Sequence, residues 1–114
     1  MRKARLLRAV RWRLRKPERW VKGLLAVDAR SVSVGVTDPV AVAWCLAGAT
    51  SAARPVRRRY HTWSPTDWVE YVALDGCIKR RGYPSTERFN DAPETTHADV
   101  LAVLGEAIAE YEGR

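Results

Sequence analysis

Apolar side chains recur at helical spacing near the start of the chain. Leu6, Val10 and Leu14 follow one another at intervals of four residues, and Leu7 flanks them. At about 100° per residue, these positions fall on one side of a helix. The pattern therefore predicts a basic amphipathic helix over residues 2–16, which Pro17 ends because proline has no amide hydrogen.

Two short runs rich in β-branched residues come next, at 24–27 and 32–36. The polar residues between them are typical of a tight connection. Together they predict a small β-hairpin within about residues 22–36. Because a two-stranded hairpin is marginal by itself, it must pack against the helices.

An uncharged run covers residues 39–53. Asp38 can cap free amides, and Pro39 suits the first helical position, so the pair predicts a helix start. A helix without charge on any side is expected to be buried nearly all round. This run is therefore the expected central helix, and Gly48 is expected to let a neighbour approach closely.

Capping signals predict two more helices. Ser64 with Asp67 begins one that closes near Gly82, and Thr96 with Asp99 begins the last. The connection between them, residues 83–96, is expected to be a long loop. The last helix carries an apolar face made of Val100, Leu101, Leu104, Ala107, Ile108 and Tyr111.

These elements predict a mainly α fold, a compact bundle of about four helices with one small β-hairpin. Residues 1–19 form the basic helix, and residues 20–114 form a single small helical domain. A length of 114 residues suits one domain. The longest uncharged stretch is shorter than the roughly 20 residues of a membrane-spanning helix, and we expect a cytoplasmic protein.

The charge is uneven along the chain. Twenty Lys and Arg against thirteen Asp and Glu give +7. Residues 1–22 carry +9, residues 23–83 carry +3 and residues 84–114 carry −5. Either the two ends neutralise each other in the fold, or the basic end is available to an acidic partner.

Three sequence blocks suggest a family. They are W-x-x-G from Trp20, DP-x-AV-x-WC-x-x-GA from Asp38 and FND-x-P-x-x-TH-x-x-VL from Phe89. Together they resemble a family of short bacterial and bacteriophage proteins of unknown function. The resemblance covers roughly residues 20–110, with a gap at 54–82. It implies a compact, mainly helical fold and no particular reaction.

A second group of residues could form a ligand pocket or stay structural: Trp44, Cys45, Asn90, Asp91 and His97. Cys45 and His97 also allow a nucleophile and base. A thiol inside an apolar helix is usually inert, however, so we expect packing and capping roles. Neither cysteine lies in a zinc-binding motif, and no metal or cofactor is expected.

The basic helix is the main functional signal. The expected contact residues are Arg5, Arg8, Arg11, Trp12, Arg15 and Lys16, extended by Arg57, Arg58 and Arg59. Arginines can follow phosphates while a tryptophan stacks on bases. The alternatives are a solvated face, or one paired with the acidic last helix. An anionic membrane surface would suit the same composition.

The sequence thus favours a small non-enzymatic binding protein that contacts nucleic acid or an acidic partner surface. A second hypothesis is a phage- or prophage-type accessory protein that acts on a host factor by protein–protein contact. A third is an unrecognised enzyme that uses Cys45 and His97. The sequence does not indicate the oligomeric state.

Overall fold

The computed structural model describes residues 2–54 and 64–113. Its helices are α1 (Arg5–Arg13), the 3-10 helix η1 (Pro17–Arg19), α2 (Leu46–Ala53), α3 (Pro65–Arg80), α4 (Thr86–Asp91) and α5 (His97–Glu112). Its strands are β1 (Ala26–Val27) and β2 (Ala43–Trp44). The predicted fold class, mainly α with one small antiparallel sheet, is confirmed.

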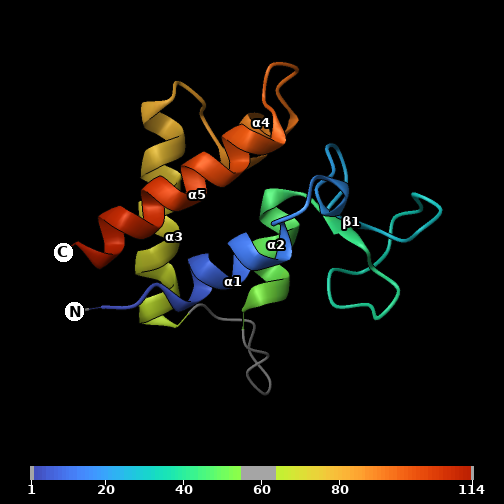
Figure 1. The fold of residues 1–114 in the computed structure, drawn as a ribbon, viewed down its shortest axis with the longest axis horizontal. Coiled ribbons are helices and arrows are strands. Elements are labelled where there is room, and N and C mark those ends of the chain that lie inside the picture. Colours follow the sequence, from blue (N-terminus) through green and yellow to red (C-terminus); the bar gives the residue numbers. More distant parts are fainter. Residues whose placement is uncertain (1, 55–63, 114) are drawn as a thin grey trace.

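The helices form one packed group. α3 packs along α5, and α1 contacts α2, α3 and α5. Figure 1 shows the first and last described parts of the chain at the same side of the molecule, with the sheet and its loops at the opposite side. The apolar side of α1 is buried as predicted, since Leu7, Val10 and Leu14 have no exposed surface. The helix itself is shorter than residues 2–16.

The sheet has a different partner from the predicted one. β1 lies within the expected first strand, but it pairs antiparallel with β2, in the register Ala26–Trp44 and Val27–Ala43. Residues 32–34 also lie beside β1. They form an isolated antiparallel bridge between Val27 and Ser33, with hydrogen bonds from the Asp28 amide to the Val32 carbonyl oxygen at 2.9 Å and from the Val34 amide to the Ala26 carbonyl oxygen at 3.1 Å. The predicted hairpin is therefore present as one bridge, and the extended segment before α2 pairs with the opposite edge of β1, where Leu25 and Val27 accept hydrogen bonds from the Cys45 and Val42 amides.

The predicted central helix is correspondingly shortened. Asp38 and Pro39 do not start a helix. The Asp38 side chain accepts a hydrogen bond from the Val40 amide within a turn. The helix begins only at Leu46, and Cys45 is its N-cap. Gly48 has the expected close neighbour, because a Cβ there would lie 1.9 Å from the Leu25 carbonyl oxygen.

The capping predictions for α3 and α5 are confirmed. The Ser64 side chain accepts from the Asp67 amide, and Thr96 and Asp99 form a capping box. The connection at 83–96 is not a plain loop, because it contains α4, which Ser85 caps. No helix within residues 2–54 and 64–113 is both long and apolar enough to cross a membrane.

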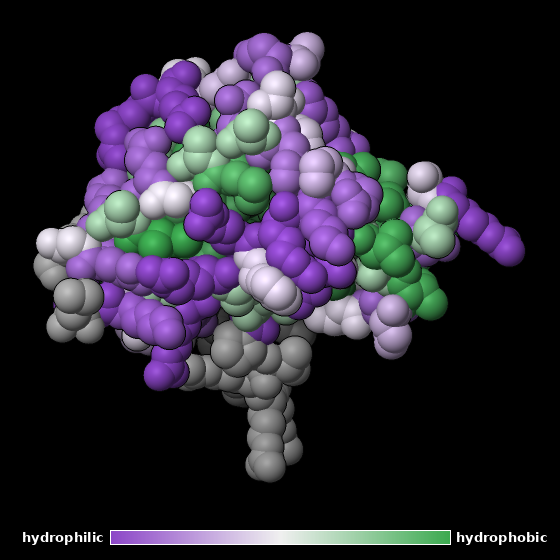
Figure 2. All heavy atoms as spheres, viewed as in Figure 1, coloured by the Kyte–Doolittle hydropathy of each residue, from purple (hydrophilic) through white to green (hydrophobic). Residues whose placement is uncertain are grey.

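Apolar residues remain exposed around the sheet. The largest exposed fractions belong to Leu25, Val32 and Val40, at 56%, 56% and 55%. Figure 2 shows hydrophobic surface at the side of the molecule where these loops lie, whereas the surface over the helices is mostly hydrophilic.

Candidate functional site

Six of the nine predicted contact residues belong to α1 or follow it closely in the chain. We call the surface of these six residues the cationic face: Arg5, Arg8, Arg11, Trp12, Arg15 and Lys16. Arg15 is half-buried, and the other five are exposed. The placement follows from the amphipathic pattern, because burial of the leucines and Val10 in the core turns the opposite side of the helix to solvent.

Two glutamates from other helices cap α1. The helix has no acidic residue in its first turn and no side-chain cap of its own. Glu70 of α3 accepts from the Leu7 amide at 3.2 Å, and Glu112 of α5 accepts from the Ala4 amide at 2.9 Å. These bonds satisfy amides that a helix start leaves without partners, and they fix α1 against α3 and α5.

Arg8 is neutralised within the fold. Its Nε and Nη2 donate to the two carboxylate oxygens of Glu112, at 2.7 and 2.6 Å. The hydrogen bond from Arg8, helped by the Ala4 amide, lowers the pKa of Glu112 to about 2. Of the alternatives predicted for the basic helix, pairing with the acidic last helix therefore holds for Arg8.

The other two glutamates of α5 pair with arginines at the C-terminal end of α3 instead. Glu110 pairs with Arg80 at 2.6 Å, and Glu106 pairs with Arg81 at 3.1 Å. Among the described residues, no carboxylate lies within salt-bridge distance of the remaining cations of the cationic face, which are Arg5, Arg11, Arg15 and Lys16. The basic charge of α1 is thus mostly unmatched by described acidic residues.

Trp12 lies exposed in the middle of these cations. Its side chain is 65% exposed. The Arg15 guanidinium stands 3.5 Å from the centre of the indole ring, and its Nη1 donates to the Trp12 carbonyl oxygen at 2.9 Å. A cation over an indole is attracted by the ring's negative face. The contact holds both groups in place at the surface.

A hollow lies at the surface between α1 and α5, beside Trp12. Its volume is about 300 Å³, and it is lined by Arg8, Arg11, Trp12, Arg15, Leu101 and Ile108. Gly105 lies between the two apolar lining residues along α5, and a Cβ there would be 4.0 Å from Arg11 Nη2. Sequence reasoning assigned Leu101 and Ile108 only to the core. The sequence alone gave no signal for their second role, because the hollow forms only where α5 lies beside α1.

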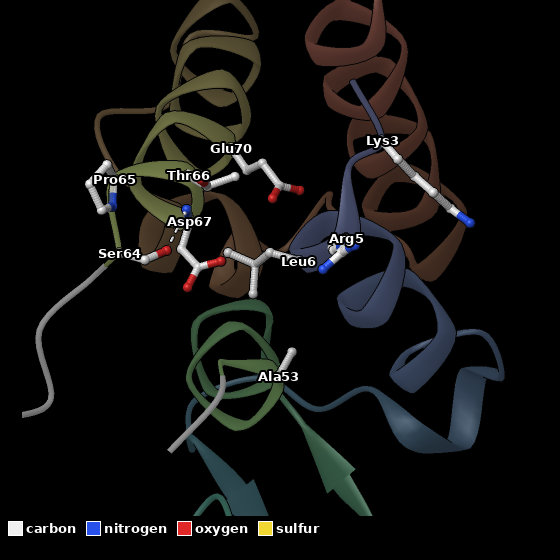
Figure 3. Close-up of a pocket in the computed structure, with 9 residues that line it drawn as sticks. All are labelled: Lys3, Arg5, Leu6, Ala53, Ser64, Pro65, Thr66, Asp67 and Glu70. Carbon is white, nitrogen blue, oxygen red and sulfur yellow. Dashed lines mark hydrogen bonds between the residues drawn. The ribbon is translucent and has the colours of Figure 1, made fainter. Parts of the chain in front are cut away.

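A second cavity lies at the other end of the cationic face, and Figure 3 shows its lining. Its volume is about 570 Å³. Lys3 and Arg5 line one side, and Asp67 and Glu70 line the other. Glu70 is fully buried, and its Oε2 has no hydrogen-bond partner. Burial raises the pKa of Glu70 despite the amides that it accepts from.

Asn90, from the predicted pocket group, holds three segments together. It is 1% exposed. Its Oδ1 accepts from Trp20 Nε1 at 2.6 Å and from the Leu46 amide at 2.9 Å, and its Nδ2 donates to the Val21 carbonyl oxygen. Asp91 accepts from Asn90 Nδ2 and from the Gly23 amide. The motif residues Trp20 and Gly23 therefore meet Asn90 and Asp91.

The other members of that group also contact the fold. Cys45 Sγ accepts from the Gly48 amide, and burial raises the pKa of the thiol. His97 Nε2 lies 2.6 Å from the Leu14 carbonyl oxygen. Trp44 Nε1 donates to the Val36 carbonyl oxygen, 3.0 Å away. These contacts fit capping and packing, and a ligand pocket or nucleophile here stays a hypothesis.

The predicted extension of the basic surface lies outside the described residues. Arg57, Arg58 and Arg59 belong to residues 55–63, which the structure does not describe. Of the predicted contact residues, those of the cationic face are therefore the ones whose positions the structure gives.

Comparison with known proteins identifies a family. Residues 1–110 match the model of a family described as a family of unknown function (DUF6197). No curated protein and no solved structure matches. The match agrees with the resemblance to an uncharacterised family that the sequence blocks indicate.

Proposed function

The chain belongs to this family of unknown function, and we propose that it is a small, non-enzymatic protein that binds nucleic acid through the cationic face. One observation supports the proposal above the others. Four cations of that face have no carboxylate partner among the described residues, and a 65% exposed tryptophan lies among them.

Unmatched arginines on one helix suit a phosphate backbone. Each guanidinium offers several N–H donors in a fixed plane, which match the oxygens of a phosphate. An α-helix rises about 1.5 Å per residue, so Arg5 and Arg11 stand about 9 Å apart along α1. That separation allows contacts to more than one phosphate of the same strand.

The exposed tryptophan adds an attraction that a purely electrostatic surface lacks. Successive bases stack on aromatic side chains of proteins that bind single strands. A solvated basic face needs no tryptophan, and exposure of an indole to water is unfavourable. The exposure of Trp12 is therefore better explained by a partner that covers it. We propose that the protein meets this partner in the cytoplasm.

Salt dependence tests the proposal. Binding of a fluorescent oligonucleotide is measured between about 50 and 200 mM salt, because released counterions make the affinity fall with salt. The double variant Arg11→Gln/Arg15→Gln is expected to reduce the slope of log K against log salt by about 1.4 on a single strand, since each phosphate contact contributes about 0.7.

A matched control removes the same charge elsewhere. Arg30 and Arg88 are exposed and lie away from the cationic face, in the loop after β1 and in α4. Arg30→Gln/Arg88→Gln is expected to keep the wild-type slope. Absence of salt-sensitive binding in the wild-type protein would overturn the proposal, and binding that survives nuclease treatment in a bacterial lysate would point to an acidic protein partner instead.

A further inference from the structure

We propose that the hollow between α1 and α5 receives one unpaired nucleobase, so that the protein prefers single-stranded nucleic acid to duplex. This inference rests on the proposed function, because it names the form of nucleic acid that the cationic face would bind. It uses a different part of the structure, the apolar floor of the hollow, which phosphate contacts do not need.

The size of the hollow suits a single base. Ligand sites in proteins start at about 300 Å³, and the hollow has about that volume. It is therefore large enough for one planar ring system and too small for a folded peptide. Its open side faces the same solvent as the cationic face, since Arg8, Arg11, Trp12 and Arg15 belong to both.

The chemistry of the lining also suits a nucleotide. Leu101 and Ile108 supply apolar surface from α5, and Trp12 supplies an aromatic ring from α1. Bases stack on indole rings and on arginine guanidinium planes. Because Arg15 already stands 3.5 Å from the Trp12 ring centre, the stacking group is held in place before a base arrives.

Arg11 and Arg15 give the edge of the hollow the positive charge that a phosphate needs. Arg8 is fixed by Glu112 through its Nε and Nη2, which leaves its other N–H groups for a ligand. Arg11 extends over Gly105. An apolar floor with arginines at the edge fits a base joined to its phosphate better than a lipid tail or an apolar side chain.

A duplex can place a base in the hollow only by losing base pairing and stacking. In a duplex both faces of each base are covered by neighbours, and taking a base out of the stack requires unpairing and unstacking. Duplex is therefore expected to contact only the arginines and the lysine of the cationic face. The single strand is expected to make those contacts and to place a base in the hollow as well.

Gly105 allows a test that changes no charge. A Cβ at this position has no neighbour closer than 4.0 Å, so a larger side chain can be accommodated, and it would project towards Arg11 and fill the hollow. Gly105→Leu thus removes the proposed base site and keeps every arginine. Ala102→Leu adds the same side chain at an exposed position of α5 and is the matched control.

The experiment compares one sequence as single strand and as duplex at the same salt concentration, by fluorescence anisotropy. Wild-type protein and Ala102→Leu are expected to bind the single strand more tightly. Gly105→Leu is expected to lose about tenfold in single-strand affinity, the order of one stacked base, with duplex affinity unchanged. Circular dichroism confirms that the variants are folded.

Trp12→Ala gives an independent second variant, with Trp68→Ala, an exposed tryptophan of α3, as its control. The same selective loss of single-strand affinity is expected from Trp12→Ala alone. Equal binding of both forms by the wild type, or equal losses on both forms in Gly105→Leu and Trp12→Ala, would overturn the base site and leave the proposed function standing. No binding of either form would overturn both.

Discussion

Glu112 has two structural tasks at one carboxylate. It pairs with Arg8, and it accepts from the Ala4 amide at the start of α1. Its partners lie 104 and 108 residues away in sequence, so no local pattern could have indicated them. This is the reason that sequence reasoning could not decide which arginines of α1 are matched within the fold.

The low pKa of Glu112 predicts a pH-dependent stability. An acid with a lower pKa in the folded chain stabilises the fold fully above its usual value of 4.5, and the effect is lost as pH falls toward 2. Glu112→Gln is expected to lower the free energy of unfolding at neutral pH. Between about pH 4.5 and 2, the free energy of unfolding of this variant is expected to fall less than that of the wild type. Urea unfolding at several pH values measures this, with Glu87→Gln on α4 as control. If the free energies of unfolding of the variant and the wild type fall equally in acid, the stabilising role of ionised Glu112 would be contradicted.

Glu70 predicts the opposite pH dependence. Burial raises its pKa above 4.5, so the folded chain holds this proton more tightly, and ionisation of Glu70 costs stability as pH rises through the folded pKa. Glu70→Gln keeps an acceptor for the Leu7 amide without the charge. It is expected to be more stable than the wild type at neutral pH, by a margin that grows from about pH 4.5 upward. Lower stability of the variant at neutral pH in urea unfolding would contradict this.

The two cysteines predict slow thiol chemistry. Both are buried, and burial raises the pKa of Cys77 to about 11, helped by its hydrogen bond to Glu110. Because the thiolate is the reactive form, both thiols are expected to react with Ellman's reagent far more slowly in the folded protein than in denaturant. A thiol that reacts at the rate of free cysteine in the folded protein would support the enzymatic hypothesis instead.

At the scale of elements, capping signals predicted the starts of α3 and α5 but not that of α2, since Asp38 and Pro39 do not start a helix. Ser64 and the pair Thr96 and Asp99 set the starts of α3 and α5 correctly because the caps are local contacts. The uncharged run at 39–53 was ambiguous, since an apolar run fits a buried strand as well as a buried helix. The pairing of β1 with β2 decided between them, and it depends on contacts between distant residues. α4 has six residues, too few to show a period.

Two glycine-to-alanine changes in helices are predicted to have opposite effects. In Gly48→Ala, the new methyl group would overlap the Leu25 carbonyl oxygen, which is expected to cost about 2 kcal/mol or more. In Gly105→Ala it meets nothing within 4.0 Å except Arg11, and the gain in helix propensity is expected to stabilise α5 by about 0.5 to 1 kcal/mol. Urea unfolding of both variants measures whether each substitution lowers or raises the free energy of unfolding. A stable Gly48→Ala protein would contradict the close approach of α2 to residue 25.

At the scale of the whole molecule, the charges are divided between two surfaces. Two of the α5 glutamates pair with Arg80 of α3 and with its C-cap Arg81, and one pairs with Arg8. The sequence indicated that a basic start and an acidic end exist, but their pairing depends on helix packing. The cationic face itself was predictable because one amphipathic helix fixes which residues face solvent. The hollow could not be predicted, because it forms only where α5 packs beside α1.

The central claim is that the cationic face is the surface that nucleic acid covers, and a chemical-shift titration tests it most directly. A single-stranded oligonucleotide is added to the isotope-labelled protein. Shifts are expected at the Trp12 indole N–H and at the arginine side chains of α1, with little change at the indoles of Trp20 and Trp44, which donate to groups within the fold. Shifts confined to other surfaces, with the Trp12 indole unchanged at saturation, would contradict the account.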